Sequence, residues 1–232
     1  MTIPMTEQHL SLPHTTWRVG ARTRQVAAVL VGLVLLAGCG LTQPPPVKES
    51  FMLASRAAPT ASPRPHAATL RIGSFGVVAP FEGRGIVFRT TEVNYQSDFY
   101  NEFFVAPGAM VRERVGAYLT AARPFRSIAL DPRVAGRYQL RGVVTQMLGD
   151  VRHKAAPAAV LAIHFYLVAT DPPADRLVYD RLVEQRVALP DTSARAVVDG
   201  LGAALDQVLA TLADDLGRLD LAALEASAPR MR

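Results

Sequence analysis

The chain has 232 residues, half of them hydrophobic, and a formal net charge of +5 from 25 Lys and Arg against 20 Asp and Glu. Basic residues alternate with acidic ones, as in Arg112-Glu113-Arg114, whereas nucleic-acid binders usually show a clustered basic face. We therefore expect no nucleic acid partner. The single cysteine excludes an intrachain disulfide and a metal site built from several cysteines.

The chain opens with a predicted export signal. Several arginines precede an uninterrupted apolar run at residues 26–37. This run is shorter than the roughly 18 to 20 residues that cross a bilayer as a helix, and it has the length of a signal-peptide core. We interpret residues 1–38 as a cleaved signal, with Met1 or Met5 as the true start.

The signal ends in Leu36, Ala37, Gly38 and Cys39, which resemble the lipobox of bacterial lipoproteins. A lone cysteine buried in an apolar helix is the alternative, but it does not account for the arginines and the short apolar run. The resemblance implies diacylglycerol and an N-acyl chain on Cys39. Gly40, where an aspartate would favour the inner membrane, implies a lipid anchor in the outer membrane, facing the periplasm.

The rest of the chain divides into three parts. Residues 39–50 contain the lipidated cysteine and Pro44-Pro45-Pro46, which favours an extended spacer. The folded domain is expected at residues 51–218 and a flexible tail at 219–232.

Eight strands are predicted from alternating or continuous apolar residues. The range 158–169 is apolar almost throughout, which predicts a central strand covered on both faces. Short loops between the last three strands predict antiparallel neighbours. The predicted strands are residues 51–53, 69–78, 86–89, 100–105, 125–130, 137–148, 158–169 and 177–189.

Two helices complete the predicted domain. The first, at 109–122, follows Pro107 and Gly108 and stops before Pro124. The second begins at a cap formed by Asp191 or Thr192 and carries a long apolar stripe that must cover a sheet or a partner. The expected fold class is α/β of the α+β type, with a mixed, largely antiparallel sheet and two main helices packed on it. The stripe consists of Val197, Val198, Leu201, Leu205, Val208, Leu209, Leu212 and Leu216.

Aromatic residues are concentrated between Phe81 and Phe104 and alternate with charged residues. Exposed rings of this kind would form a surface for a protein partner or a rim for lipid. Alternatively, most of these rings belong to a core beneath a long loop. The candidate partner-binding residues are Tyr95, Phe99, Tyr100 and Phe103.

No catalytic constellation is visible, so we expect no enzyme activity, no metal and no cofactor besides the covalent lipid. For His164 we favour a hydrogen bond to a neighbouring backbone group over a role as ligand or base. Adjacent helix positions point about 100° apart, so Asp214-Asp215 is expected to be a solvated face. Gly83-Arg84-Gly85 is interpreted as a turn, because it lacks the Lys-Ser/Thr ending of a phosphate-binding loop.

The order of elements resembles that of the ABC-type transport auxiliary lipoproteins, the PqiC-like lipoproteins of Mce-type intermembrane lipid transport systems. Many relatives have a tryptophan before the proline that precedes the first helix, whereas residues 39–232 contain none. The resemblance implies a fold similar to the N-terminal domain of TolB. It is carried by Phe51-Met52-Leu53, Ile86-Val87-Phe88-Arg89, Tyr95 with Tyr100, Pro107, and Tyr138-Gln139-Leu140-Arg141-Gly142.

The same resemblance implies a non-enzymatic function. The expected partners are an Mce-domain protein that bridges the periplasm and, through it, an inner-membrane ABC permease and ATPase, with a homo-oligomeric ring as a possible assembly. The alternative is a lipoprotein that carries lipid in its own groove or assembles outer-membrane components. A lipoprotein hydrolase ranks last, for want of a nucleophile with a base.

Overall fold

The computed structural model describes residues 47–54, 57–170, 175–221 and 223. The predicted signal, the lipobox, Cys39 and most of the linker and tail lie outside the described residues. The strands are β1 (Glu49–Phe51), β2 (His66–Val77), β3 (Gly85–Arg89), β4 (Tyr95–Phe103), β5 (Phe125–Ala129), β6 (Tyr138–Asp150), β7 (Ala158–Ala169) and β8 (Arg176–Ala188). The helices are the 3-10 turn η2 (Ala79–Phe81), α2 (Pro107–Ala122) and α3 (Ala194–Arg218).

All eight strands belong to one sheet that forks at β6. On one side, β6, β7 and β8 are joined by long antiparallel ladders, as predicted. On the other side, the first half of β6 pairs with β2, which pairs with β5, and its last residues pair with β3, followed by β4 and β1. Within this forked part only β3 and β4 are antiparallel. The predicted mixed sheet is confirmed.

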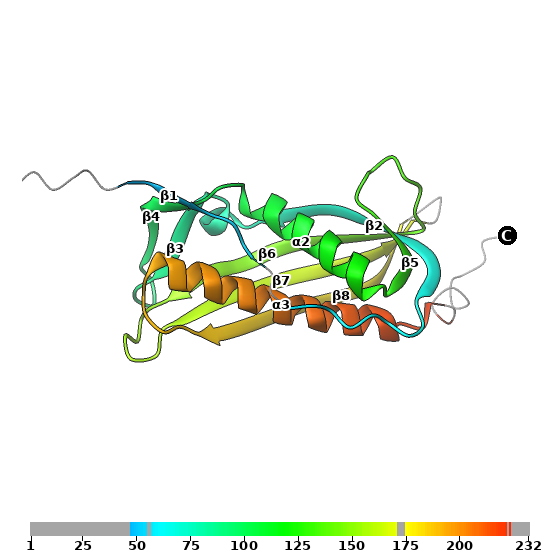
Figure 1. The fold of residues 1–232 in the computed structure, drawn as a ribbon. Coiled ribbons are helices and arrows are strands. Elements are labelled where there is room, and N and C mark those ends of the chain that lie inside the picture. Colours follow the sequence, from blue (N-terminus) through cyan, green and yellow to red (C-terminus); the bar gives the residue numbers. More distant parts are fainter. Residues whose placement is uncertain (1–46, 55–56, 171–174, 222, 224–232) are drawn as a thin grey trace, which may run out of the picture. The chain divides into compact units, whose positions relative to one another are not determined.

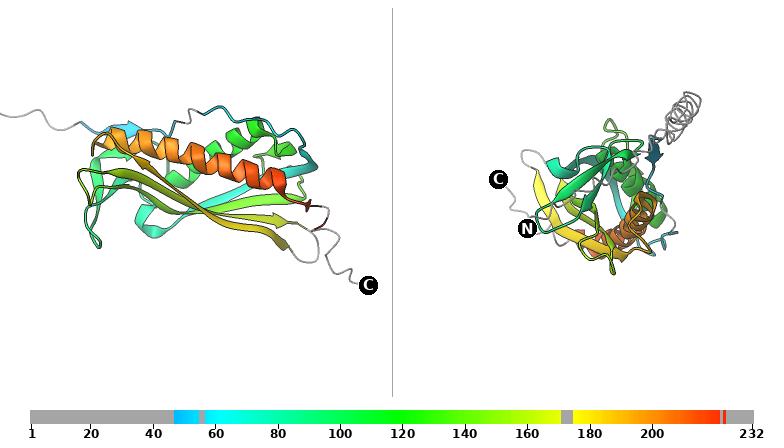
Figure 2. Two further views of the ribbon diagram at one scale, coloured as in Figure 1. Left: turned by 90° about the horizontal axis from the view of Figure 1, so that it is seen from below. Right: turned by 90° about the vertical axis from the view of Figure 1, so that its left-hand side faces the viewer.

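Both α-helices cover the same face of the sheet (Figures 1 and 2). The apolar face of α3 packs on β7 and β8, and α2 packs on β2 and β5. All eight residues of the predicted α3 stripe are buried. They recur with the 3.6-residue period of a helix, so they lie on the one side of α3 that faces the sheet. Although α3 is long and apolar enough to cross a membrane, most of it is buried in the body, which identifies it as a core helix.

The strand β7 is covered on both faces over only half of its length. Ala158 to Ile163 are buried, whereas His164, Tyr166 and Val168 are half-buried. These three alternate with Phe165 and Leu167, which face the helices. The second half of β7 therefore contributes to the face of the sheet that carries no helix.

Three local predictions are corrected. The first strand, expected at residues 51–53, is β1 at Glu49–Phe51, so the fold begins within the predicted linker at 39–50. The strand β4 begins at Tyr95 instead of residue 100, because a polar and largely exposed segment pairs through its backbone with β3. Helix α3 is capped by Ser193 instead of Asp191 or Thr192: the Ser193 hydroxyl accepts the Ala196 N–H at 3.2 Å. The Asp191 carboxylate accepts the Ser193 N–H at 2.8 Å and so supports the cap from one step further out.

Candidate functional site

Three of the four candidate aromatic residues are exposed along β4. Tyr95, Phe99 and Tyr100 are 45%, 69% and 42% exposed, and we call them the β4 aromatic surface. The rings of Phe99 and Tyr100 meet edge to face, with centroids 5.2 Å apart. Phe103 is different: it is only 2% exposed and belongs to the core, so the expectation that it faces a partner is corrected.

A bulge in β4 places Phe99 and Tyr100 at its tip. The pairing of β3 with β4 shifts register between Gly85 and Val87, which leaves extra residues in β4. Asp98 holds the bulge, because its Oδ1 accepts the backbone N–H groups of Tyr100 at 2.8 Å and of Asn101 at 3.0 Å. The two exposed rings are thus presented on a hydrogen-bonded turn.

Gly85 allows the bulge to lie close to β3. A Cβ atom at Gly85 would lie 2.8 Å from the Asp98 carbonyl oxygen and would also collide with Ser97 Oγ. Gly83, two residues earlier, has nothing within 4 Å of such an atom. In the predicted turn at Gly83-Arg84-Gly85, the last position therefore requires a residue without a Cβ atom, whereas the first does not.

The start of the described chain lies beside the β4 aromatic surface. Strand β1 runs parallel to β4, with Glu49 opposite Asn101. Just before it, Lys48 places its Nζ 4.2 Å from the centroid of the Phe99 ring, a cation–π arrangement. The surface thus lies beside β1, at the start of the described chain (Figure 1).

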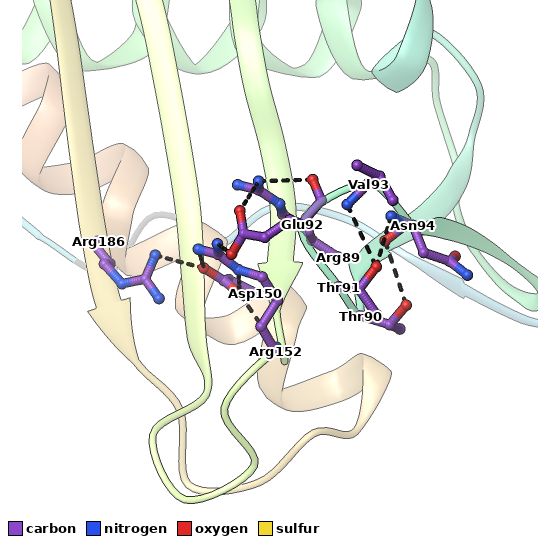
Figure 3. A network of polar contacts seen from close by, with 9 residues as sticks. All are labelled: Arg89, Thr90, Thr91, Glu92, Val93, Asn94, Asp150, Arg152 and Arg186. Atoms are coloured by element: carbon purple, nitrogen blue, oxygen red, sulfur yellow. Dashed lines mark hydrogen bonds and ion pairs between the residues drawn. The ribbon is translucent and has the colours of Figure 1, made fainter.

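An ion-pair network fixes the β3–β4 loop to the sheet (Figure 3). Glu92 in the loop pairs with Arg89 at 2.9 Å and also with Arg152. Arg152 in turn pairs with Asp150, at the end of β6, at 2.7 Å, and Arg186 on β8 pairs with the same carboxylate at 2.9 Å. The loop is therefore tied to two strands of the sheet.

Asp150 is the centre of this network. It is 2% exposed, and the hydrogen bond from Arg152, with a second from Arg186, holds the pKa of its carboxyl group well below the usual range. At neutral pH the carboxylate is therefore charged and fully engaged.

Tyr95 packs against η2 and the end of β3. Its ring lies edge to face on Phe81, with centroids 6.4 Å apart, and the Arg89 guanidinium lies 5.5 Å from its centroid. Because Arg89 is also held by Glu92, the orientation of Tyr95 depends on the network. A preorganised surface of this kind loses less conformational entropy when it binds a partner.

The other sequence candidates do not assemble into a reactive site. His164 is bonded by two side chains instead of the expected backbone group: its Nδ1 lies 2.8 Å from the Tyr166 hydroxyl, and its Nε2 contacts Asp180. Asp215 is not solvated as expected, since it accepts the Tyr179 hydroxyl at 2.7 Å, whereas Asp214 pairs with Arg218 near the surface. Within residues 47–54, 57–170, 175–221 and 223, no three His, Cys, Asp or Glu side chains could jointly hold a metal ion.

Sequence reasoning missed the residues that support the β4 aromatic surface. In an Asx turn, an aspartate side chain accepts a backbone N–H group from a residue two positions later. An aspartate such as Asp98 in a polar segment is a sequence signal for this turn. Lys48, Asp150 and Arg152 gave no such signal, because their contacts join segments far apart in the chain.

No protein-family model and no curated protein sequence matches the chain. Among solved structures, a Xanthomonas campestris protein described as a DUF330 protein aligns over 77% of this chain and 99% of its own, with 18% identity and a TM-score of 0.64. A protein described as uncharacterized aligns over 73% of this chain and 99% of its own, with 19% identity and a TM-score of 0.60. A hypothetical Chlamydia trachomatis protein aligns over 65% and 96%, with 8% identity and a TM-score of 0.45. The chain therefore has the fold of the first two proteins.

Proposed function

We propose that the protein is a non-enzymatic lipoprotein that docks the periplasmic part of an Mce-type lipid transport system to the outer membrane. Lipid on Cys39 would provide the anchor, residues 40–48 the spacer, and the folded body the docking surface. Because each buried CH₂ contributes about 0.8 kcal/mol, several acyl chains hold a protein to a bilayer far more firmly than one does.

The observation that carries this proposal is the β4 aromatic surface. Exposed, rigidly supported aromatic rings are typical of the residues that dominate binding at protein interfaces. Here Phe99 and Tyr100 stand on the Asp98 turn, and Tyr95 is held by the ion-pair network. The proposed partner is an Mce-domain protein, connected in turn to an inner-membrane ABC permease and ATPase.

The fold gives additional support. DUF330 comprises PqiC-like lipoproteins, and the sequence resemblance rests on the same group. The lipobox, on which the location in the outer membrane depends, stands on the sequence alone.

Photo-crosslinking in cells tests the docking surface. A crosslinking amino acid at position 99 of the full chain is expected to capture an Mce-domain protein, whereas one at Leu182 is the control, since Leu182 is 53% exposed but lies on β8. Equal capture from both positions, or none from positions 95, 99 and 100, would contradict the proposal. Phospholipid that copurifies with the protein in place of a protein partner would favour the alternative of a lipid carrier.

The anchor needs its own test. Mass analysis of the wild-type protein should find acyl and diacylglycerol groups on an N-terminal Cys39, and Cys39→Ser should leave the protein unlipidated and outside the membrane fraction. An unmodified thiol in a full-length cytosolic protein would end this part of the proposal without bearing on the docking surface.

A further inference from the structure

A hollow of about 610 Å³ lies beside β2, where β5 ends and leaves the rest of β2 paired only with β6 on its other side. Residues of β2, β6, the start of α2 and the β5–β6 loop contribute to it. Its lining contains three arginines and no acidic residue. The arginines are Arg71, Arg112 and Arg141.

Arg112 spans the open edge of β2. Its Nε donates to the Gly73 carbonyl oxygen at 2.9 Å, and its Nη2 donates to the Leu130 carbonyl oxygen at 2.6 Å. These contacts fix the guanidinium group in place, but carbonyl acceptors do not neutralise its charge.

Arg141 and Arg71 approach the hollow from the strands. The Nε of Arg141 donates to Gln139 Oε1 at 2.8 Å, and the Nη1 of Arg71 reaches the Pro132 carbonyl oxygen only at 3.5 Å. The Nε of Arg71 is buried and has no hydrogen-bond partner within the described part of the chain. A buried donor without an acceptor is costly, so the site as it stands is incomplete.

The positive charge of the hollow is not balanced by nearby carboxylates. Among the described residues, all three arginines donate their hydrogen bonds to neutral carbonyl or amide oxygens. Asp131, adjacent to Pro132 in the chain, pairs with Arg133 at 3.2 Å. The first turn of α2, which reaches the lining at Gly108, has no acidic residue and no side-chain cap, so its partial positive charge adds to that of the arginines.

Gly73 forms the floor of the hollow and keeps it open. A Cβ atom there would lie 3.0 Å from Arg141 Cγ and 3.1 Å from Gln139 Nε2. Arg141 therefore lies directly over the β2 backbone, and a side chain at position 73 would push it away.

We propose that this hollow binds a phosphate group, either free phosphate or the headgroup of a phospholipid. Arginine presents a planar fork of donors that matches phosphate oxygens, and three such groups supply enough positive charge for a phosphate monoanion or dianion. A bound oxygen would also give Arg71 Nε its missing acceptor. This proposal does not depend on the lipid anchor or on the docking surface.

Calorimetric titration of the full chain in a nonionic detergent tests the site. The probes are inorganic phosphate and glycerophosphoglycerol, the deacylated headgroup of phosphatidylglycerol. Saturable binding of at least one probe is expected. Arg71→Gln and Arg141→Gln should each weaken it by at least about tenfold. The control is Arg195→Gln, because Arg195 is 72% exposed and lies outside the hollow; it should leave the affinity unchanged.

The outcomes separate the possible sources of the phosphate group. Tighter binding of glycerophosphoglycerol points to a phospholipid headgroup, whereas equal or tighter binding of inorganic phosphate points to the free ion. No saturable binding of either probe would overturn the proposal, as would equal weakening by Arg195→Gln. Thermal unfolding of each variant identifies any loss of fold, and Arg71→Lys, which keeps the charge without the fork, should bind between wild type and Arg71→Gln.

Discussion

The hydroxyl group of Tyr179 on β8 donates a hydrogen bond to Asp215 on α3, with 2.7 Å between the two oxygens. Arg181, two residues further along β8, reaches the same carboxylate at 2.6 Å. Burial, together with the hydrogen bond to the Asp215 carboxylate, raises the pKa of the Tyr179 hydroxyl, so the phenol stays protonated and keeps donating. These two contacts tie the outermost long strand to the core helix.

Replacing Tyr179 with phenylalanine should weaken this connection. The substitution removes the donor while Arg181 still binds Asp215, so we expect the free energy of unfolding to fall by about 1 kcal/mol. Urea denaturation measures the change. Tyr100→Phe is the matched control, because the Tyr100 side chain is exposed on the bulge and should change stability by less than about 0.5 kcal/mol. Equal losses in both variants would contradict a specific role of the Tyr179 hydroxyl.

A methyl group added at Gly85 should disturb the bulge in β4, whereas one added at Gly83 should not. In Gly85→Ala the new Cβ would collide with Ser97 and Asp98, so we expect a loss of about 1 to 3 kcal/mol and weaker capture of the partner by the β4 aromatic surface. Gly83→Ala meets open space and should leave both nearly unchanged. Thermal unfolding and crosslinking from position 99 measure the two effects. If both variants behave alike, Gly85 does not shape the bulge.

The helices and strands that could be predicted from the sequence are those whose buried side produces a regular repeat of apolar residues. The α3 stripe and the three long strands repeat apolar residues at the periods of a helix and a strand, so their type and approximate position were predictable. The start of β4 was not, because Tyr95 to Ser97 are exposed and are held in the strand by backbone pairing with β3. The parallel pairings of β2 with β5 and β6 also join distant segments and leave no local signal.

The candidate site shows the same limit. The sequence identified the exposed rings Tyr95, Phe99 and Tyr100 as candidates, but it could not separate them from Phe103. Residues near a bulge do not follow strict alternation, so spacing along β4 does not tell which ring turns inward. Likewise, the three arginines of the hollow come from two strands and a helix, and only the fold brings them together.

Acid should reduce the contribution of the ion-pair network to the stability of the folded protein. The folded-state pKa of Asp150 lies below its unfolded value of about 3.9, so the network's contribution is fully present above that pH and is lost as the pH falls toward the folded-state pKa. We expect Asp150→Asn to cost about 2 to 3 kcal/mol at pH 7 and about 1 kcal/mol less at pH 3, because pH 3 lies about one unit below the unfolded pKa and the folded carboxyl is still charged there. Urea denaturation at both pH values measures the difference.

Asp131→Asn is the control for the acid experiment, since Asp131 is half-exposed and pairs with the highly exposed Arg133. Exposed pairs contribute little, so its effect should be small at both pH values. An Asp150→Asn variant whose stability follows the wild-type pH dependence would show that other groups cause the acid sensitivity.

Two phenylalanines four residues apart should respond in opposite ways to truncation. Phe99→Ala removes an exposed ring and should change stability by less than about 0.5 kcal/mol while abolishing capture of the partner from position 95. Phe103→Ala empties a core position and should cost about 3 to 5 kcal/mol. Chemical denaturation and crosslinking of both variants distinguish the roles. If Phe99→Ala retains full capture, this ring does not dock the partner, and the exposed end of β4 must be explained in another way.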